Sequence, residues 1–275
     1  MLSPSALFSV VGLQRLVGTK ETLVPKFFGA SFLPPGDVPT ILTNEVYTRA
    51  QTCSTRRSVF NASKIANAIG PIQQQLSSED IALSIILRCA MAARRSVTGF
   101  SRPSLFLKVT NLRMRMNPPL PENAVGNLFW LTSVFLKESE IELYDLVLKM
   151  RHALVEFCNE NVNKLKGDEG SALVTEPLKE SEDVLKTNPD IFRCTSLRQF
   201  PLYEMDFGWG KPIWATSPIY IENVIVLADT RLGDGIEAWV TFEKEVMAIF
   251  ECDQELLVLL LSTAVLLSIT AGSEH

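Results

Sequence analysis

Few side chains in this 275-residue sequence could act as an acid or a base in catalysis. There are two histidines, and one of them, His275, is the last residue. The other, His152, stands four residues before Glu156. An imidazole suits general-base catalysis because its pKa lies near neutrality. The apolar periodicity around His152, however, predicts that it lies in the middle of a helix, partly exposed and without a catalytic role.

A second group of candidates is formed by the carboxylates of Asp229, Asp234 and Glu237, which flank two glycines. Such a group could form a weak calcium loop. We favour a tight turn, because Gly233 and Gly235 can supply the positive φ angles that a short connection needs. The sequence has neither a nucleophile elbow (Gly-x-Ser-x-Gly) nor a phosphate loop (Gly-x-x-x-x-Gly-Lys). Residue chemistry alone therefore reveals no catalytic site.

Composition limits the classes of protein to consider. The net charge is −5, and basic residues adjoin only in short pairs such as Arg56-Arg57 and Arg94-Arg95, which argues against nucleic-acid binding. Hydrophobic residues make up 47% of the chain, and its length allows one or two domains with a large core. The composition thus predicts a core-rich globular protein, or a fragment whose partner surface is missing.

The five cysteines are widely spaced and form no Cys-x-x-Cys pair. This usage predicts unpaired thiols in a reducing compartment, with no disulfide framework and no metal site. Residues 1–5 lack the basic region of a signal peptide, so we expect a cytoplasmic protein.

The apolar run over residues 256–267 is shorter than the roughly 18–20 residues that cross a bilayer. It predicts a terminal helix packed on the core, with a membrane anchor as the alternative.

Helical and strand patterns alternate along the chain, which predicts an α/β layer fold. Ser77-Ser78-Glu79-Asp80 can begin a helix, because it places a capping oxygen and acidic groups at the positive end of the helix dipole. We expect helices over residues 5–17, 61–76, 77–95, 138–166, 175–187 and 242–250. Strands are expected over residues 55–60, 105–112, 125–136, 191–195, 202–206, 213–228 and 236–242.

Two further motifs suggest a family. Residues 206–212 read Asp-Phe-Gly-Trp-Gly-Lys-Pro, and residues 229–239 contain Asp-Thr-Arg followed by Gly-Asp-Gly-Ile-Glu-Ala-Trp. This pair resembles the carboxyl-terminal signature of the plant BAHD acyl-CoA-dependent acyltransferases, and the vinorine-synthase-like members most closely. Further blocks resemble the family in the same order, at residues 32–39, 55–65, 89–94, 111–121, 126–127 and 200–204.

The resemblance implies a chloramphenicol-acetyltransferase-like α/β fold, a two-layer sheet and helix domain, with the N-terminal domain largely missing. Residues 1–20 would be a remnant helix of that N-terminal domain, and residues 21–45 the crossover linker between the two halves. Residues 46–275 would form the C-terminal BAHD domain.

The resemblance also implies a reaction. Family members transfer an acyl group, with acetyl favoured here, from a CoA thioester to an alcohol of a plant specialised metabolite such as an alkaloid. Acyl-CoA is a co-substrate, no bound cofactor is expected, and full-length members are usually monomeric. The family's catalytic His-x-x-x-Asp motif is absent from this sequence. We therefore expect no catalytic residue here, and a truncated chain that is inactive alone.

Some site residues can be carried over from the family. Asp206-Phe207-Gly208-Trp209-Gly210 is expected to be structural, with Asp206 paired to Arg113, and its glycines to lie where a Cβ would clash. On this basis Asp206→Ala is expected to damage folding before chemistry. Ser63 and Lys64 are expected to approach the phosphates of CoA.

The sequence departs from the family pattern in several places, including Ser77–Asp80, Leu87-Arg88 and Thr195–Gln199. Two alternatives to a fragment of an active transferase therefore stay open. The chain could be a catalytically inactive remnant or a non-enzymatic module that binds CoA or a protein. It could also be completed by a second chain that supplies the missing half.

Overall fold

The fold is that of a computed structural model, which describes residues 26–27, 52–67, 77–121, 123–126, 128–136, 142–165, 170, 173, 183–198, 200–206, 208–217 and 221–260. The predicted helix over residues 5–17 and most of the predicted crossover linker lie outside these residues. So do Phe207, most of the 175–187 helix and the end of the apolar run after Leu260. No helix within the described ranges combines the length and the apolar character that crossing a membrane requires.

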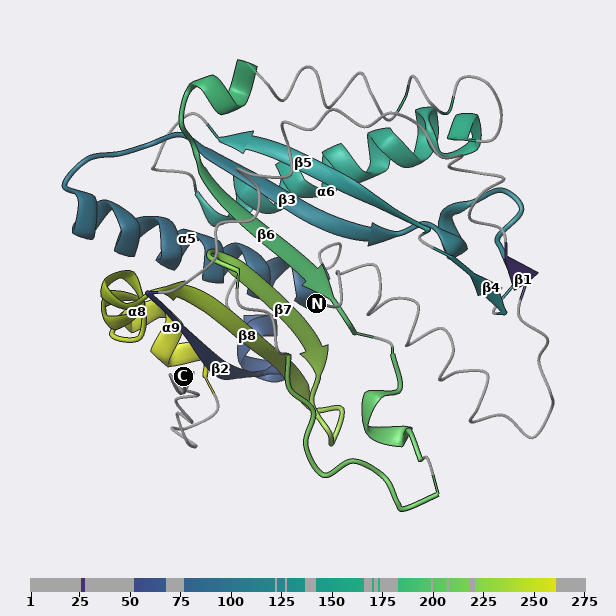
Figure 1. The fold of residues 1–275 in the computed structure, drawn as a ribbon. Helices are drawn as coiled ribbons and strands as arrows, with labels where there is room; N and C mark the ends of the chain where they lie inside the picture. Colours follow the sequence, from purple (N-terminus) through teal and green to yellow (C-terminus); the bar gives the residue numbers. More distant parts are fainter. Residues whose placement is uncertain are drawn as a thin grey trace, which may run out of the picture.

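A six-stranded mixed sheet forms the centre of the fold (Figure 1). Its order is β2-β8-β7-β6-β3-β5. The strands are β2 (Cys53–Asn61), β3 (Ser104–Asn111), β5 (Phe129–Leu136), β6 (Asp190–Ser196), β7 (Val224–Asp229) and β8 (Gly235–Glu243). From the pairing, β2, β7, β6 and β3 run in one direction, and β8 and β5 run in the other. A separate pair joins β1 (Lys26–Phe27) to β4 (Ala124–Val125).

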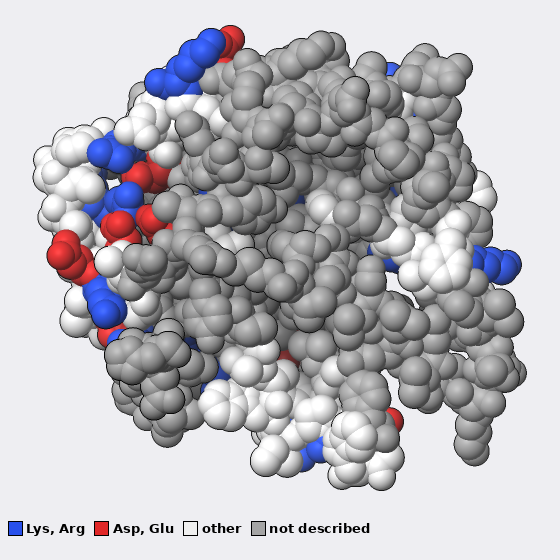
Figure 2. All heavy atoms as spheres, viewed as in Figure 1, with Lys and Arg blue, Asp and Glu red and all other residues white. Residues whose placement is uncertain are grey.

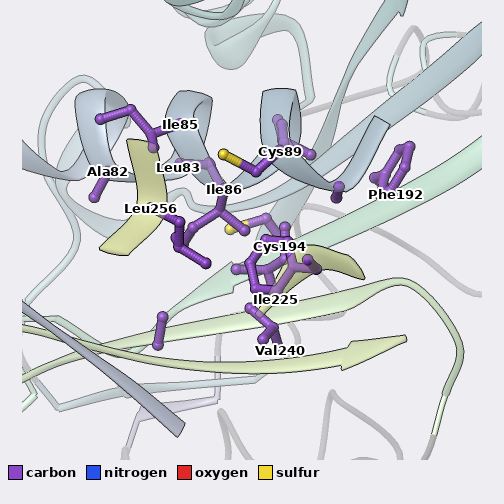
Figure 3. Packing of buried hydrophobic residues seen from close by; sticks show 14 of the residues in the cluster. Ala82, Leu83, Ile85, Ile86, Cys89, Phe192, Cys194, Ile225, Val240 and Leu256 are labelled. Carbon is purple, nitrogen blue, oxygen red and sulfur yellow. The ribbon is translucent and has the colours of Figure 1, made fainter. Parts of the chain in front are cut away.

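Helices cover one face of this sheet. They are α4 (Ala62–Asn67), α5 (Ser78–Thr98), α6 (Leu143–Glu160), α8 (Lys244–Phe250) and α9 (Gln254–Leu259). Each contributes to one apolar cluster together with alternate residues of the strands. Figure 3 shows Ile86 and Cys89 of α5 above Cys194, Ile225 and Val240 of the sheet. Burial of this apolar area is the main source of stability for the two layers.

The longest helix, α5, forms because both of its ends are capped. The Ser77 hydroxyl accepts a hydrogen bond from the Asp80 amide, and Glu79 and Asp80 stand in the first turn. At the other end Gly99 adopts a left-handed conformation with φ 77°, and its amide donates to the Arg95 carbonyl. The predicted start is confirmed, and the helix runs to Thr98 rather than Arg95.

Ionic contacts also fix α5 on the sheet. At its amino end, Lys108 Nζ of β3 lies 2.8 Å from Glu79 Oε1 and 3.1 Å from Asp80 Oδ1. Arg198, just after β6, donates from Nη1 to the Ser78 hydroxyl at 3.1 Å. At its carboxyl end, Arg94 pairs with carboxylates next to β6, β7 and β8. The helix therefore spans the sheet with charged contacts at both ends.

The opposite face of β7 and β8 carries a smaller apolar cluster. Val226 and Trp239 belong to it, and Phe200 and Leu202 pack against it. The segment after β6 therefore lies over this face, and it includes the 3₁₀ turn η4 (Leu202–Glu204).

Several predicted elements need correction. Residues 202–206 are not a strand, because Leu202–Glu204 close a 3₁₀ turn in which the Glu204 amide donates to the Pro201 carbonyl. Of the described residues in the predicted 213–228 strand, those from Val224 onward form a strand, β7, which ends at Asp229. Residues 213–217 stand between Pro212 and Pro218, which cannot donate to a strand ladder. A helix does lie within residues 138–166, as predicted, over Leu143–Glu160, and the 3₁₀ helix η3 (Val162–Leu165) follows it. The sequence predicts it to be the longest helix, but α5 is longer.

Gly235 offers a test of the β2–β8 register. An added Cβ at Gly235 would lie 2.2 Å from the Phe60 carbonyl oxygen. We expect Gly235→Ala to cost about 1–3 kcal/mol of unfolding free energy, because two paired backbones must separate. Gly99→Ala is the control. A Cβ added at Gly99 would meet nothing within 4 Å, but the alanine would have to adopt the positive φ of this residue. The substitution should cost about 1 kcal/mol, through the left-handed backbone conformation alone. Urea denaturation measures both, and equal losses would contradict the register.

Candidate functional site

Four strands end at the same edge of the sheet, which we call the carboxyl edge. It lies where the arrowheads of β3, β6 and β7 point in Figure 1. The last residues of these strands are Asn61, Asn111, Ser196 and Asp229. In open α/β sheets, ligands bind outside the carboxyl ends of the strands. This edge is therefore the candidate substrate site.

The two candidate CoA contacts, Ser63 and Lys64, lie at this edge in the first turn of α4. The side chain of Asn61, at the end of β2, accepts hydrogen bonds from the amides of Ser63 at 2.9 Å and Lys64 at 3.1 Å. Both side chains are exposed. Lys64 Nζ donates to the Leu260 carbonyl at 2.7 Å. The ammonium group is thus accessible to an anion while held near α9.

The β7–β8 connection is next to them, because the Ala62 amide donates to the Asp234 carbonyl. The Thr230 hydroxyl organises this turn, accepting from the amides of Asp234 and Gly235 and donating to Asp234 Oδ1 at 2.7 Å. Gly233 has the predicted positive φ of 70°. Gly235 does not, and its close approach to Phe60 explains the glycine instead.

The three carboxylates of this region do not converge. Asp229 pairs with Arg198 at 2.6 Å, Asp234 bonds to Thr230, and Glu237 bonds elsewhere. The tight-turn interpretation is therefore favoured over a calcium loop. One group in the described ranges could geometrically hold a metal, formed by Cys89, Asp253 and Glu255. Asp253 there caps α9, and Glu255 pairs with Arg88, so both carboxylates already have protein partners.

Glu237 of β8 forms a partly buried ion pair that the sequence does not predict. Its carboxylate is 2% exposed and receives a bidentate contact from Arg57, with Nη2 at 2.7 Å and Nε at 3.1 Å. Tyr203 donates its hydroxyl to the same carboxylate at 3.1 Å. Burial, and then the charge of Glu237, raises the pKa of Tyr203, which therefore stays a donor. The hydrogen bond to Glu237 likewise raises the pKa of Arg57. The contact anchors η4 to β2 and β8.

The Asp206 loop follows η4. Asp206 Oδ1 accepts hydrogen bonds from the amides of Gly208 at 2.8 Å and Gly210 at 2.9 Å. These bonds, that from Gly208 first, lower the pKa of Asp206. The two glycines have φ of 100° and 103°, and a Cβ on either would meet nothing within 4 Å. The predicted role of avoiding a clash is therefore wrong, since these positions favour glycine through their φ angles.

The predicted pair between Arg113 and Asp206 is also wrong. Arg113 donates from Nε to the Ala124 carbonyl at 3.0 Å and from Nη2 to the Gly126 carbonyl at 2.8 Å. Burial lowers the pKa of Arg113, and Asp206 is exposed. Each group is satisfied locally, Arg113 by the β4 segment and Asp206 by its own loop. These local hydrogen bonds take the place of the predicted ion pair.

His152 lies in the middle of α6 with 80% of its side chain exposed. Its Nδ1 is 3.5 Å from Glu156 Oε2 one turn later. The predicted mid-helix, exposed placement is confirmed. All five cysteines are unpaired, as predicted. Burial raises the pKa of Cys53 to about 11 and that of Cys89 to about 12, so both stay thiols near neutrality.

Two carboxylates of this region make a matched test. Glu237→Gln removes the charge that Arg57 and Tyr203 bind, and we expect it to cost about 2–4 kcal/mol. This cost is smaller than that of breaking a fully buried ion pair, because the side chain of Arg57 is 30% exposed. Asp206→Ala should leave the denaturation midpoint unchanged, because Asp206 is exposed and bonds only within its loop. Urea denaturation checks both, and a larger loss for Asp206→Ala would restore its predicted role in folding.

Comparisons with known proteins agree with this architecture. The family model described as Transferase family matches residues 19–257. Akuammiline synthase 1 of Alstonia scholaris is 38% identical over 218 residues, which are 77% of this chain and 51% of that protein. Salutaridinol 7-O-acetyltransferase of Papaver somniferum is 30% identical, over 85% of this chain and 57% of that protein. The chain thus spans about half the length of the curated relatives it matches.

Solved structures also match this chain. The crystal structure of vinorine synthase superposes with a TM-score of 0.72 at 26% identity, covering 93% of this chain and 60% of that one. A Fusarium sporotrichioides TRI101 structure, complexed with coenzyme A and T-2, matches with a TM-score of 0.60 at 14% identity, over 93% of this chain and 64% of that one. The second likeness concerns the fold alone. The chain belongs to the plant BAHD acyl-CoA-dependent acyltransferases, the transferase family whose α/β fold it shares.

Proposed function

We propose that this chain supplies the carboxyl-terminal half of an acyl-CoA-dependent O-acyltransferase acting on a plant specialised metabolite. The observation that carries the proposal is the 38% identity to akuammiline synthase 1 over 77% of the chain. Residues 46–275 would be the C-terminal domain, residues 21–45 the crossover linker, and residues 1–20 a remnant of the N-terminal domain. Names of relatives such as salutaridinol 7-O-acetyltransferase favour acetyl as the group transferred and an alkaloid-like alcohol as the acceptor.

The catalytic base is assigned to the other half of the enzyme. His152, the histidine of the described residues, lies on α6 in the helical layer, and the sequence has no His-x-x-x-Asp. In the proposed reaction, an imidazole from the amino-terminal half takes the proton of the acceptor alcohol, whose oxygen attacks the thioester carbonyl. The tetrahedral intermediate collapses to the ester, and the CoA thiolate leaves and is protonated. This chain would bind and orient acyl-CoA.

Ser63 and Lys64 are the proposed contacts to CoA. Both are exposed at the carboxyl edge directly after β2, and an ammonium group there can pair with a phosphate. No bound cofactor is required in this scheme, because acyl-CoA is consumed as a co-substrate. The unpaired cysteines favour a reducing compartment, so we place the enzyme in the cytoplasm, as a monomer once both halves are present.

A second candidate is a non-enzymatic module that binds a protein or CoA. It is favoured by large apolar side chains that are exposed in the Asp206 loop and the β7–β8 turn. Trp209 is 83% exposed, Ile213 81% and Leu232 84%. Exposed apolar groups that gather in one region often mark an interaction surface.

The transfer reaction separates the two candidates. We expect the purified chain alone to release CoA from acetyl-CoA at the background rate with any alcohol in an acceptor panel. A fusion of the amino-terminal half of akuammiline synthase 1 to this chain should transfer acetyl, because it restores the base. The same fusion with the motif histidine replaced by alanine is the control. Turnover by the chain alone would contradict the assignment of the base, and an inactive, folded fusion would favour the module.

Lys64 can be tested in the active fusion. Lys64→Ala should raise KM for acetyl-CoA about tenfold while changing kcat little, because loss of one charge-assisted contact is worth about 1.4 kcal/mol. Lys244→Ala, an exposed lysine at the start of α8, is the control. Melting temperatures must accompany both, since Lys64 also bonds to Leu260. An unchanged KM in a stable Lys64→Ala variant would remove Lys64 from the CoA site.

A further inference from the structure

A polar cavity of about 430 Å³ lies at the edge opposite the carboxyl edge, where β6 and β7 begin. Figure 2 shows basic and acidic side chains gathered on the left, the side on which these strands begin in Figure 1. The cavity is within the size range of small-molecule sites. Its lining residues include Arg94, Arg102, Arg193, Asn188, Glu222 and Asn223. None of them takes part in the proposed acyl transfer.

The first unusual feature of this cavity is its backbone. Asn188 and Asn223 are the two residues other than glycine that have a positive φ in the described part of the chain, at 50° and 54°. Both line the cavity. Asparagine tolerates this conformation better than most residues, but it still costs free energy relative to a relaxed backbone. Backbone strain of this kind gathers at ligand-binding sites.

The second feature is a buried acceptor without a donor. Asn223 is 5% exposed, and its Nδ2 donates to Glu222 Oε1 at 3.3 Å. Among the residues that the structure describes, nothing donates to its Oδ1. Leaving such a group unsatisfied carries a free-energy cost, because it has lost its water without gaining a partner. A ligand that donates a hydrogen bond there would recover part of this cost.

The charges of the cavity are unequally compensated. Arg94 is surrounded by carboxylates, with Asp190 at 2.9 Å, Glu243 at 2.8 Å and Glu222 at 3.2 Å. Arg102 instead lies over the ring of Phe100, 4.8 Å from its centroid, and no carboxylate of the described ranges pairs with it. A guanidinium in this state is suited to bind an incoming oxyanion in a bidentate manner.

The remaining charged groups also permit an anion. Arg193 donates from Nη1 to the carbonyls of Ile191 and Glu222, both at 3.2 Å, which adds positive charge to the wall. Burial, followed by the neighbouring charge of Glu243, raises the pKa of Glu222. The charge of Glu222 is partly offset by Arg94, whose Nη1 lies 3.2 Å from Glu222 Oε1.

We propose that this cavity binds a small oxyanion, a carboxylate or a phosphate, that also carries a hydrogen-bond donor. Arg102 receives the oxyanion, and the donor, such as a hydroxyl group, bonds to Asn223 Oδ1. The site is separate from the carboxyl edge of the sheet. It can therefore be occupied whether or not the chain takes part in acyl transfer.

The test uses the purified full chain and three probes, with binding followed by calorimetry and by the shift in melting temperature. Malate and succinate differ by one hydroxyl, so malate should bind about tenfold more tightly, the effect of one hydrogen bond of about 1.4 kcal/mol. Inorganic phosphate is the third probe, and saturable binding of it would support an oxyanion site at Arg102. Absence of saturable binding for all three probes would overturn the proposal.

Variants then locate the site. Arg102→Gln should weaken all bound probes at least tenfold, because it removes the charge that receives the oxyanion. Asn223→Gly keeps a backbone that favours a positive φ and removes only the amide, so it should weaken malate and leave succinate unchanged. Arg231→Gln, an exposed arginine at the carboxyl edge, is the matched control and should change nothing. Equal binding by Arg102→Gln and the unmodified chain, or equal weakening by Arg231→Gln, would contradict the site.

Discussion

The contact between α5 and the sheet is the constraint on which the other features depend. Ten of its residues are buried, and nine of these form the largest share of the main apolar cluster. Apolar packing alone does not fix the position of a helix along its axis, because a slide by one turn presents a similar stripe. Charged contacts at the two ends remove this freedom. Lys108 binds the first turn, and Arg94, near the other end, binds carboxylates beside three strands.

Different groups gather at the two edges of the sheet. The strands β2, β7, β6 and β3 run in one direction, so their carboxyl ends gather Ser63, Lys64 and the Asp206 loop. Their amino ends gather the arginines and carboxylates around Arg94. A ligand at the amino edge would lie in a cavity that is also lined by Arg94 and Glu222, whose ion pair helps to hold the carboxyl end of α5. We therefore expect occupancy there to stabilise the sheet–helix contact without touching the proposed CoA contacts at the carboxyl edge.

Much of the fold could be predicted from local signals. Ser77, Glu79 and Asp80 fixed the start of α5, because capping and the helix dipole act within one turn. The strands with alternating apolar residues were also placed within a few residues. The errors lie where the decisive contact is distant in sequence. Glu237 looked like a turn carboxylate, and its partner Arg57 is 180 residues away. The available signal was the position of Glu237 between the apolar Ile236 and Ala238, which places its carboxylate on the opposite face of the strand.

Arg113 and Asp206 show why a motif does not determine a contact. Both are capable of a bidentate ion pair, and the resemblance to the family suggested that they form one. Two backbone amides already satisfy Asp206, and two carbonyls satisfy Arg113. Forming the pair would require both groups to give up these bonds, and the exposed position of Asp206 makes a new ion pair weak. The loop is held instead through Tyr203 and the buried Glu237, where the low exposure makes the same chemistry strong.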